Sequence, residues 1–466
     1  MRTLQRTDTQ PGAGIQQFQP PPSRAGRAQA ERDFAEALAI PRVGTLSRHA
    51  TDCRRNAEWL LGKFRQMGMD ASLHEFGGGH PTVRADWLGA PGKPLLTIYG
   101  HYDVQPPDPL EEWISPPFAA TIREGAIFAR GACDNKGMHL SALKAAEYAL
   151  AAGGPPLNLR FLIEGEEEGG GEVLPNLLKT HAEELRSDFV FIDDGTLLQV
   201  LTGLRGNLYT EIEVTGAAID LHSGAFGGLV ANPFNTLAQI LAGLKGRDGH
   251  IRIPGFYNNV RNPSPEELAD WRRLPYDEAL LLRITGAPAL EGEAGYDIFQ
   301  RNFSRPTLDV HGIMGGFTDE GAKTVIPARA TAKLSMRLVP DQDPTAILVS
   351  LTDFAEVLAT PGTRTLVRSL GEPSWPVTLN PGPRLLEAAG KAFTASFGRA
   401  PYVVRAGYSI PVVTDFIANL PDAQILVSGF SEETDGAHSP NEKMTLEHFH
   451  RGTEMVLHLM DQLGVS

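Results

Sequence analysis

Acidic residues or histidines follow short apolar runs at four places in the sequence, at the fourth of them after a loop. A fifth acidic segment lies between the first two runs and leads into a helical stretch. In open α/β sheets, ligands bind at the carboxyl ends of the strands, so we expect these five segments to meet at one rim. The residues concerned are His101 and Asp103 after residues 94–100, Asp134 within 130–137, Glu166, Glu167 and Glu168 after 159–164, Asp193 and Asp194 after 188–192, and His438 after 424–428.

Several carboxylates gathered at one rim repel one another unless cations neutralise them. Imidazole and carboxylate ligands together suit zinc, and also manganese or cobalt. The alternative is that these acids are solvated loop ends or helix caps. Any single one of these acids is well explained as a solvated loop end or a cap. The coincidence of all five segments is explained much less well in that way. The pattern therefore indicates a divalent metal site, in which one carboxylate can bridge two ions while each ion takes further histidine and carboxylate ligands.

The apolar runs are continuous rather than alternating, which is typical of strands buried on both faces. Residues 137–151 predict a helix between the first two runs, and residues 27–40 and 47–68 predict two earlier helices. Strands separated by helices in this way are typical of an α/β domain with a largely parallel sheet.

The middle of the chain follows another pattern. Residues 208–214 and 331–339 alternate apolar and polar side chains, which predicts half-exposed antiparallel strands. Helices are expected to begin near Pro233 and at Pro344, where a capping aspartate precedes the proline. We therefore expect an α+β domain over residues 204–384, inserted between two parts of the α/β domain at 27–203 and 385–466.

The composition of the 466 residues, 42% hydrophobic and 21% charged, suits a folded protein of two or three domains. A formal net charge of −14 argues against nucleic acid as a partner. Since no apolar run of about 18 residues occurs, we expect no membrane span. Residues 1–26 lack the apolar core of a secretory signal and predict a disordered tail. The two cysteines, Cys53 and Cys133, fit a reducing cytoplasm.

The spacing of nine short motifs resembles the co-catalytic dizinc metallopeptidases, which include carnosine-type dipeptidases, aminoacylases and succinyl-diaminopimelate desuccinylase. The likeness is greatest to the cytosolic dipeptidase branch. It implies a zinc-exopeptidase-like, three-layer αβα catalytic domain with an inserted lid and dimerisation domain. The motifs are GHYDVQP (100–106), RGACDNKG (130–137), IEGEEEGG (163–170), IDDG (192–195), DLHSGAFGG (220–228), KTVIP (323–327), MRLVP (336–340), SIP (409–411) and DGAHSPNEK (435–443).

The resemblance implies a role for each metal ligand. His101 would bind one ion, Asp134 would bridge both, Glu168 and Asp194 would each bind one, and His438 would complete the set. The two ions per subunit are expected to be Zn²⁺, with Mn²⁺ or Co²⁺ as alternatives. The peptide bond between Asp134 and its successor is expected to be cis.

The resemblance also implies the residues that handle protons. Asp103 would hold the other nitrogen of the His101 imidazole. Glu167 would be the general base: it takes a proton from a water that bridges the two ions, the resulting hydroxide attacks the amide carbon, and Glu167 then protonates the leaving amine. Because Glu166, Glu167 and Glu168 are consecutive, the assignment could slip by one residue.

Further residues match family positions that contact substrate. His222 would stabilise the oxyanion, acting in the neighbouring subunit's site in dimeric members, so we expect a homodimer formed through the inserted domain. Arg337, Thr324 and Ser409 would bind substrate, since a guanidinium can hold a carboxylate in bidentate fashion. The alternative for Arg337 is an ordinary solvated arginine. For His222 the alternatives are a histidine that only caps or packs within its own domain and a monomer whose lid closes His222 over its own site.

Two departures leave the substrate open. Relatives commonly read Arg-Glu-Gly-Gly-Ser-Ile-Pro where this chain has Ala406 and Tyr408 in place of the glutamate and the second glycine. Cys133 and His139 are expected to be buried residues rather than ligands.

From the resemblance we expect a cytoplasmic metallo-dipeptidase or related exopeptidase acting on small peptides. The alternatives are a deacylase of N-acyl amino acids with the same mechanism and an inactive binding protein of the same fold.

Overall fold

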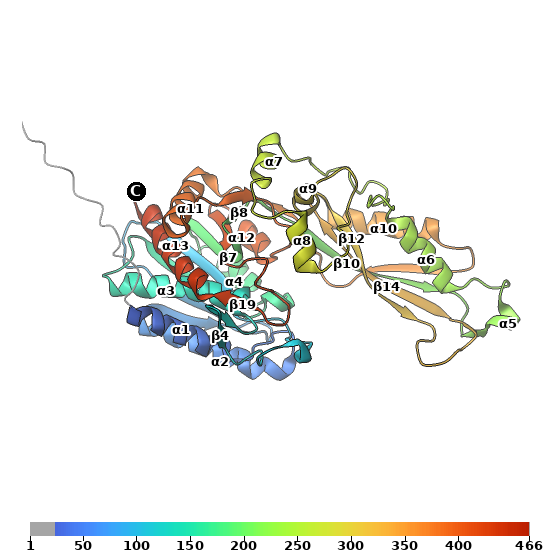
Figure 1. Cartoon of the computed structure of the whole chain (residues 1–466), viewed down its shortest axis with the longest axis horizontal. Coiled ribbons are helices and arrows are strands. Elements are labelled where there is room, and N and C mark those ends of the chain that lie inside the picture. Colours follow the sequence, from blue (N-terminus) through green and yellow to red (C-terminus); the bar gives the residue numbers. More distant parts are fainter. Residues whose placement is uncertain (1–23, 466) are drawn as a thin grey trace, which may run out of the picture.

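The computed structural model describes residues 24–465, so most of the predicted tail lies outside the described part. Helix α1 (Arg24–Leu38) begins three residues before the expected start at 27. Two bodies lie end to end in the molecule, one built on a six-stranded sheet and one on a four-stranded sheet (Figure 1). The chain enters the second body after β9 (Gly203–Leu204) and is back in the first at α11 (Gly382–Phe397).

The six-stranded sheet has the order β1-β2-β6-β3-β7-β18. The four predicted buried runs form β3, β6, β7 and β18, which are parallel, while β2 joins β6 antiparallel. The predicted largely parallel sheet is therefore confirmed, with an antiparallel pair added at one edge. The strands are β1 (Asp70–His74), β2 (Thr82–Trp87), β3 (Leu95–His101), β6 (Asn158–Glu164), β7 (Phe189–Leu197) and β18 (Gln424–Gly429).

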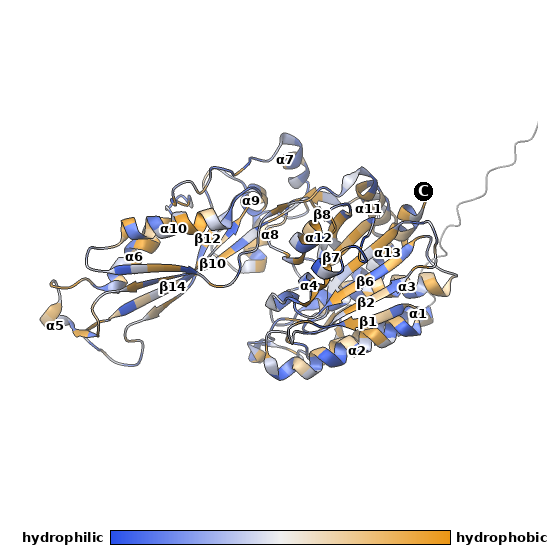
Figure 2. Cartoon of the chain, turned by 180° about the vertical axis from the view of Figure 1, so that it is seen from behind, coloured by the Kyte–Doolittle hydropathy of each residue, from blue (hydrophilic) through white to orange (hydrophobic). Residues whose placement is uncertain are grey.

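Neighbouring residues on each parallel strand enter different cores, which makes the body three-layered. Ile98 of β3 packs in the core on one face, together with α1, α2, α3, α11 and α13. Tyr99, the next residue, packs in the core on the opposite face with α4 and α12. These helices are α2 (Ala50–Gln66), α3 (Gly137–Ala151), α4 (Val173–Thr180), α12 (Val412–Asn419) and α13 (Leu446–Gly464). Because both faces are covered, the strands are apolar along their length (Figure 2).

A glycine lets α3 approach the end of β3 closely. A Cβ on Gly100 would lie 2.6 Å from the Cβ of His139 and 2.9 Å from Oδ1 of Asn135. This contact brings the short helix η3 (Ala132–Lys136), which contains Asp134, against the last residue of β3, His101. As predicted, His139 is buried and belongs to this packing contact.

The four-stranded sheet of the second body has the order β12-β14-β10-β15 and is antiparallel throughout. Its strands are β12 (Thr307–Gly315), β10 (Gly206–Thr215), β14 (Arg329–Leu338) and β15 (Arg364–Ser369). Helices α6 (Pro233–Leu244) and α10 (Pro344–Leu358) contribute to the same core, so this part is α+β as expected. Asp343 caps α10 by accepting hydrogen bonds from Thr345 and Ala346, and Pro344 stands at N1.

One stretch of the inserted segment packs with the first body instead. Trp271, Leu274, Phe299 and Phe303 lie in the same core as Tyr99. They come from α7 (Pro265–Trp271), α9 (Ile298–Phe303) and the chain beside them, and α8 (Glu278–Thr285) lies between these helices. The boundaries that we propose at residues 204 and 385 fall between the two sheets. Residues 265–303 lie between these boundaries, yet they pack in the core of the first body.

Short pairs and turns complete the described chain. They are the sheet of β4 (Thr121–Arg123), β5 (Ala126–Phe128) and β19 (Lys443–Thr445), the pairs β8 (Gln199–Leu201) with β17 (Tyr402–Val404), β9 with β16 (Val377–Thr378) and β11 (Leu221–His222) with β13 (Val325–Ile326), helix α5 (Ser223–Phe226), and the turns η1 (Ser47–His49), η2 (Leu110–Glu112) and η4 (Glu167–Gly169). Within residues 24–465, no helix combines the length and the apolar character needed to cross a membrane.

Replacing a ring in the first core measures how far the central sheet depends on packing. Phe161 of β6 is fully buried, and its ring lies 4.9 Å from that of Phe64 in α2. We expect Phe161→Ala to lower the free energy of unfolding by about 3–5 kcal/mol, because it removes apolar contacts and leaves a cavity. The matched control is Phe76→Ala, where the side chain is 43% exposed and a loss below about 1 kcal/mol is expected. Equal losses in urea denaturation would contradict this account of the core.

Candidate functional site

The five predicted metal ligands meet at the carboxyl ends of the parallel strands. Within residues 24–465, two groups of side chains have ligand atoms that all lie within 4.8 Å of one another. The first group is His101, Asp134 and Asp194, and the second is Asp134, Glu168 and His438. Asp134 belongs to both groups, which is the position that a bridging carboxylate requires.

The distances show how Asp134 is shared. Its Oδ1 lies 3.2 Å from Nε2 of His101, and its Oδ2 lies 3.0 Å from Nε2 of His438. Asp194 approaches the first imidazole at 3.7 Å, and Glu168 approaches the second at 3.3 Å. Each oxygen of one carboxylate therefore faces a different histidine. The peptide bond between Asp134 and Asn135 is cis, as the resemblance predicts.

The donor set fits divalent cations. Nε2 of His101 and Oε1 of Glu168 are buried, and neither has a hydrogen-bond partner in the described part of the chain. Burial opposes protonation of His101, yet the carboxylates of Asp103, Asp134 and Asp194 raise its pKa well above the usual value. Asp134 and Glu168 raise the pKa of His438 to about 10. Metal ions bound at these atoms would neutralise the negative charge of the gathered carboxylates.

Asp103 connects His101 to the glutamate loop. Nδ1 of His101 lies 3.1 Å from the backbone carbonyl oxygen of Asp103 and 3.4 Å from its carboxylate. The carboxylate accepts hydrogen bonds from the backbone N–H groups of Glu167 and Glu168, at 3.2 and 3.0 Å. Asp103 thus faces the imidazole as predicted, but its carboxylate also fixes the backbone of the two residues proposed as base and ligand.

The three consecutive glutamates point in different directions. The Glu166 carboxylate accepts hydrogen bonds from the backbone N–H groups of His80 and Val173, away from the two groups of ligands. Glu168 faces His438, and Glu167 lines the cleft beside the ligands. Burial raises the pKa of Glu167 well above its usual value, and the carboxylates of Asp194 and Glu168 raise it further. This geometry favours the predicted register, since Glu168 faces a histidine of the ligand groups and Glu167 lines the cleft beside them.

A carboxylate that is not among the predicted site residues lies behind Asp134. Glu442 is fully buried and accepts hydrogen bonds from Nη1 of Arg130 at 2.8 Å and from the N–H groups of Gly131, Cys133 and Asp134 at 2.8, 2.9 and 3.1 Å. It lies 308 residues from Asp134 in the sequence, and only its place in the motif DGAHSPNEK marked it. The Cys133 thiol also donates to Glu442, so this cysteine is a buried neighbour as expected.

Asn135 was missed as well. Its Oδ1 accepts a hydrogen bond from the backbone N–H of His101, and its Nδ2 donates to the backbone oxygen of Asp193 and to Oδ1 of Asp194. One amide therefore joins the end of β3 and the middle of β7 to η3. The loop that carries His438 is closed in a similar way, by the ion pair of Lys443 with the buried Asp435 at 2.7 Å.

A cleft of about 460 Å³ opens over the ligand groups. Two of the three predicted substrate residues lie in its wall. Arg337, on β14 of the second sheet, donates a hydrogen bond from Nη1 to Oγ of Ser409 at 3.0 Å, so the cleft joins the two bodies. Tyr408, the residue that departs from the family pattern, lines the same cleft.

His222 and Thr324 lie elsewhere. Both are exposed and adjoin the β11–β13 pair, where the backbone N–H of Ser223 donates to the carbonyl oxygen of Thr324. Nδ1 of His222 accepts hydrogen bonds from Gly224 and Ala225 and so caps α5. Both views place α5 at the end of the second body that is distant from the first (Figures 1 and 2). In this arrangement neither residue lines the cleft of its own chain.

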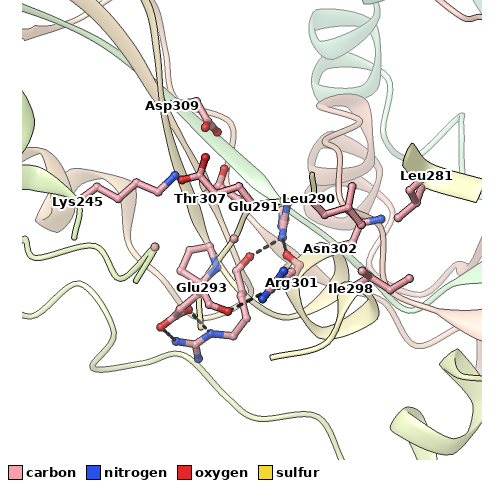
Figure 3. Close-up of a pocket in the computed structure, with 15 residues that line it drawn as sticks. Lys245, Leu281, Leu290, Glu291, Glu293, Ile298, Arg301, Asn302, Thr307 and Asp309 are labelled. Atoms are coloured by element: carbon pink, nitrogen blue, oxygen red, sulfur yellow. Dashed lines mark hydrogen bonds and ion pairs between the residues drawn. The ribbon is translucent and has the colours of Figure 1, made fainter. Parts of the chain in front are cut away.

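A second cavity of about 350 Å³ lies where α9 and β12 meet (Figure 3). Of the three acidic residues in its wall, Glu293 has partners of its own. The Glu293 carboxylate accepts hydrogen bonds from Nε and Nη2 of Arg305 at 2.7 and 2.8 Å, and it lies 2.9 Å from Nδ1 of His250. Since this cavity contains neither ligand group found in the described chain, we assign the chemistry to the cleft.

Comparison with known proteins gives a consistent result. A family model described as peptidase family M20/M25/M40 matches residues 97–462. Cys-Gly metallodipeptidase dug1 of Schizosaccharomyces pombe is 32% identical, over 92% of this chain and 94% of that protein. Beta-Ala-His dipeptidase of Homo sapiens is 31% identical, over 80% and 76%. The crystal structure of human carnosine dipeptidase 1 has a TM-score of 0.82 at 26% identity and covers 96% of this chain and 100% of that chain.

Removing the charge of Glu442 tests its position behind Asp134. We expect Glu442→Gln to weaken metal binding about 10- to 100-fold, because the amide keeps only one acceptor oxygen and turns an NH2 donor toward either Arg130 or the N–H groups of Cys133 and Asp134. Titration with zinc and a chelator measures the effect, and circular dichroism checks the fold. Glu372→Gln removes an exposed carboxylate and should bind metal as the unaltered protein does. Unchanged affinity in a folded Glu442→Gln protein would refute this role.

Proposed function

Because the chain belongs to peptidase family M20/M25/M40, we propose that it hydrolyses the peptide bond of dipeptides or short peptides with two divalent metal ions. The observation that carries the proposal is the pair of ligand groups sharing Asp134, at the floor of a cleft that also contains Arg337. A metal pair explains why these carboxylates are gathered, and a guanidinium in the same cleft suits a substrate that ends in a carboxylate.

We assign one ion to His101 and Asp194, the other to Glu168 and His438, and both to Asp134. Zinc is the proposed metal, since a mixed imidazole and carboxylate set suits it, and manganese or cobalt would fit the same ligands. The chemistry that the bound ions supply is a lower pKa for the attacking water and polarisation of the scissile carbonyl.

The protein's own residues then position the substrate and move the proton. Arg337, held by its hydrogen bond to Ser409, binds the substrate carboxylate and sets the scissile bond above Asp134. The Glu167 carboxylate takes a proton from the attacking water and delivers it to the leaving amine nitrogen. Asp103 holds the Glu167 backbone in place, so the base stays fixed as the proton moves.

We propose that two copies form a homodimer through the inserted domain, and that His222 and Thr324 complete the cleft of the partner subunit. In the described chain, Nε2 of His222 makes no hydrogen bond and is free to contact an oxyanion. Ile219 and Leu229, on either side of His222 in the sequence, are 68% and 77% exposed. Strand β12 is an edge strand whose Ile313 and Met314 are also exposed, which suits pairing between copies.

We place the enzyme in the cytoplasm. Both cysteines are free and buried, in keeping with a reducing compartment.

The substrate proposal is tested with the zinc-loaded protein, a panel of dipeptides and a panel of N-acetyl amino acids. Hydrolysis of the dipeptides supports a dipeptidase. Hydrolysis of the N-acetyl panel alone would identify a deacylase instead, and no hydrolysis of either by protein with two bound ions would indicate a binding protein.

The roles of Glu167 and Glu168 can be separated by mutation. We expect Glu167→Ala to keep both ions and to lose turnover by about 10²–10⁴-fold, because only the general base is removed. Glu168→Ala should lose one ion per chain. Metal analysis and dipeptide assays measure both effects, and Glu166→Gln is the matched control, since its carboxylate faces His80 and Val173. The opposite assignment holds if Glu167→Ala loses an ion while Glu168→Ala keeps both.

Mixing two inactive variants tests whether His222 serves the partner. His222→Ala and Glu167→Ala proteins are combined under conditions that exchange subunits. We expect activity to return, because a mixed dimer has one cleft with both residues intact. Labelled subunits show whether exchange occurred, and sedimentation gives the oligomeric state. Complete exchange without recovered activity would disprove the shared cleft, and a monomer at assay concentration would disprove the dimer.

A further inference from the structure

The cleft above the ligand groups adjoins a second, smaller recess. The recess has a volume of about 160 Å³, and Thr196, Glu432 and Glu433 line both spaces. Helix α8 and the residues before it supply most of its apolar wall, through Leu274, Pro275, Tyr276, Leu280 and Ile284. An apolar cavity of about 150 Å³ can hold a benzene-sized group. The recess therefore has room for one apolar side chain.

The charges around the cleft are unevenly distributed. Among the residues that line it, Arg337 is the fixed cation and lies on the second body, whereas Glu433 lies in the loop between β18 and His438. A ligand that fits both must carry a negative group and a positive group. A free dipeptide has this charge pattern, with a carboxylate at one end and an amine at the other.

Glu433 differs from its neighbour Glu432. Glu432 lies 3.9 Å from Nε2 of His448, whereas Glu433 forms no ion pair with any residue from 24 to 465. Glu433 is exposed as a whole residue; partial burial of its carboxyl and the nearby acids Glu432 and Asp435 raise its pKa, while hydrogen bonds with its own backbone and with Gln199 oppose the rise. A carboxylate in this setting is stabilised by a cationic ligand, and it stands at the entrance to the apolar recess.

We propose that Glu433 binds the free α-amine of the substrate and that the adjoining recess accepts an apolar side chain on its amino-terminal residue. This inference rests on the proposed dipeptidase function. The substrate then spans the cleft between Arg337 and Glu433, with its scissile bond above Asp134. The preferred class is a dipeptide with a free amine and a branched or aromatic first side chain.

The test compares Leu-Gly with 4-methylpentanoyl-glycine, which has the same shape but lacks the amine. We expect Glu433→Gln to lower kcat/KM for Leu-Gly about 10- to 100-fold, mainly through KM, as the loss of one charge-assisted hydrogen bond predicts. The analogue should be cleaved equally slowly by the unaltered and the Glu433→Gln enzymes. Glu432→Gln, which removes the adjacent carboxylate, should keep the selectivity for Leu-Gly over the analogue.

A second variant tests the recess. Leu280→Trp should fill it and lower kcat/KM for Leu-Gly about tenfold while leaving Gly-Gly unchanged, since the loss corresponds to excluding one apolar side chain. Metal content and circular dichroism are measured for each variant. If the unaltered enzyme cleaves neither dipeptide, the proposed function fails and this inference with it. If it cleaves both, an equal effect of Glu433→Gln on Leu-Gly and the analogue, or no effect on either, overturns the inference alone.

Discussion

The repulsion among Asp134, Glu168 and Asp194 is the constraint on which the site depends. Three carboxylates lie within contact distance of only two imidazoles, and His101 is fully buried. Such an arrangement persists only if cations neutralise it and if the backbone holds each group in place. The parallel sheet meets the second requirement, because its strands end at one rim and deliver these residues from distant parts of the sequence.

Behind the ligands, a layer of buried hydrogen bonds holds the loops together. The Glu442 carboxylate accepts hydrogen bonds from backbone N–H groups of η3, and the Asp103 carboxylate accepts them from η4. Asn135 joins η3 to β3 and β7. Each contact links segments that no local structure would bring together. Ligands supported in this way keep their geometry when charge or substrate changes, which is the preorganisation that metal catalysis requires.

The two bodies divide the remaining work. Arg337 reaches the cleft from β14 of the second sheet, next to the first body, whereas His222 stands on α5 at the opposite end of the second body. The second body thus presents Arg337 to the cleft of its own chain and Nε2 of the exposed His222 to the solvent. The packing of Trp271 and Phe303 into the first core anchors residues 265–303 and the recess that α8 lines. Movement of the second body relative to the first would therefore change the position of Arg337 relative to that recess.

By itself, the sequence determined the main strands and helices and the candidate ligand residues. Continuous apolar runs predicted the parallel strands, and the acids and histidines placed after them are those that the structure groups around Asp134. These signals are local, since a period of hydrophobicity or a strand end lies within a few residues. Only the tertiary structure decided that Glu442 supports Asp134, that Asp103 fixes the glutamate loop and that residues 265–303 pack against the first sheet. It also placed His222 far from its own cleft. These facts depend on contacts between residues tens to hundreds of positions apart, and burial and hydrogen bonding between such residues leave no periodic trace in the sequence.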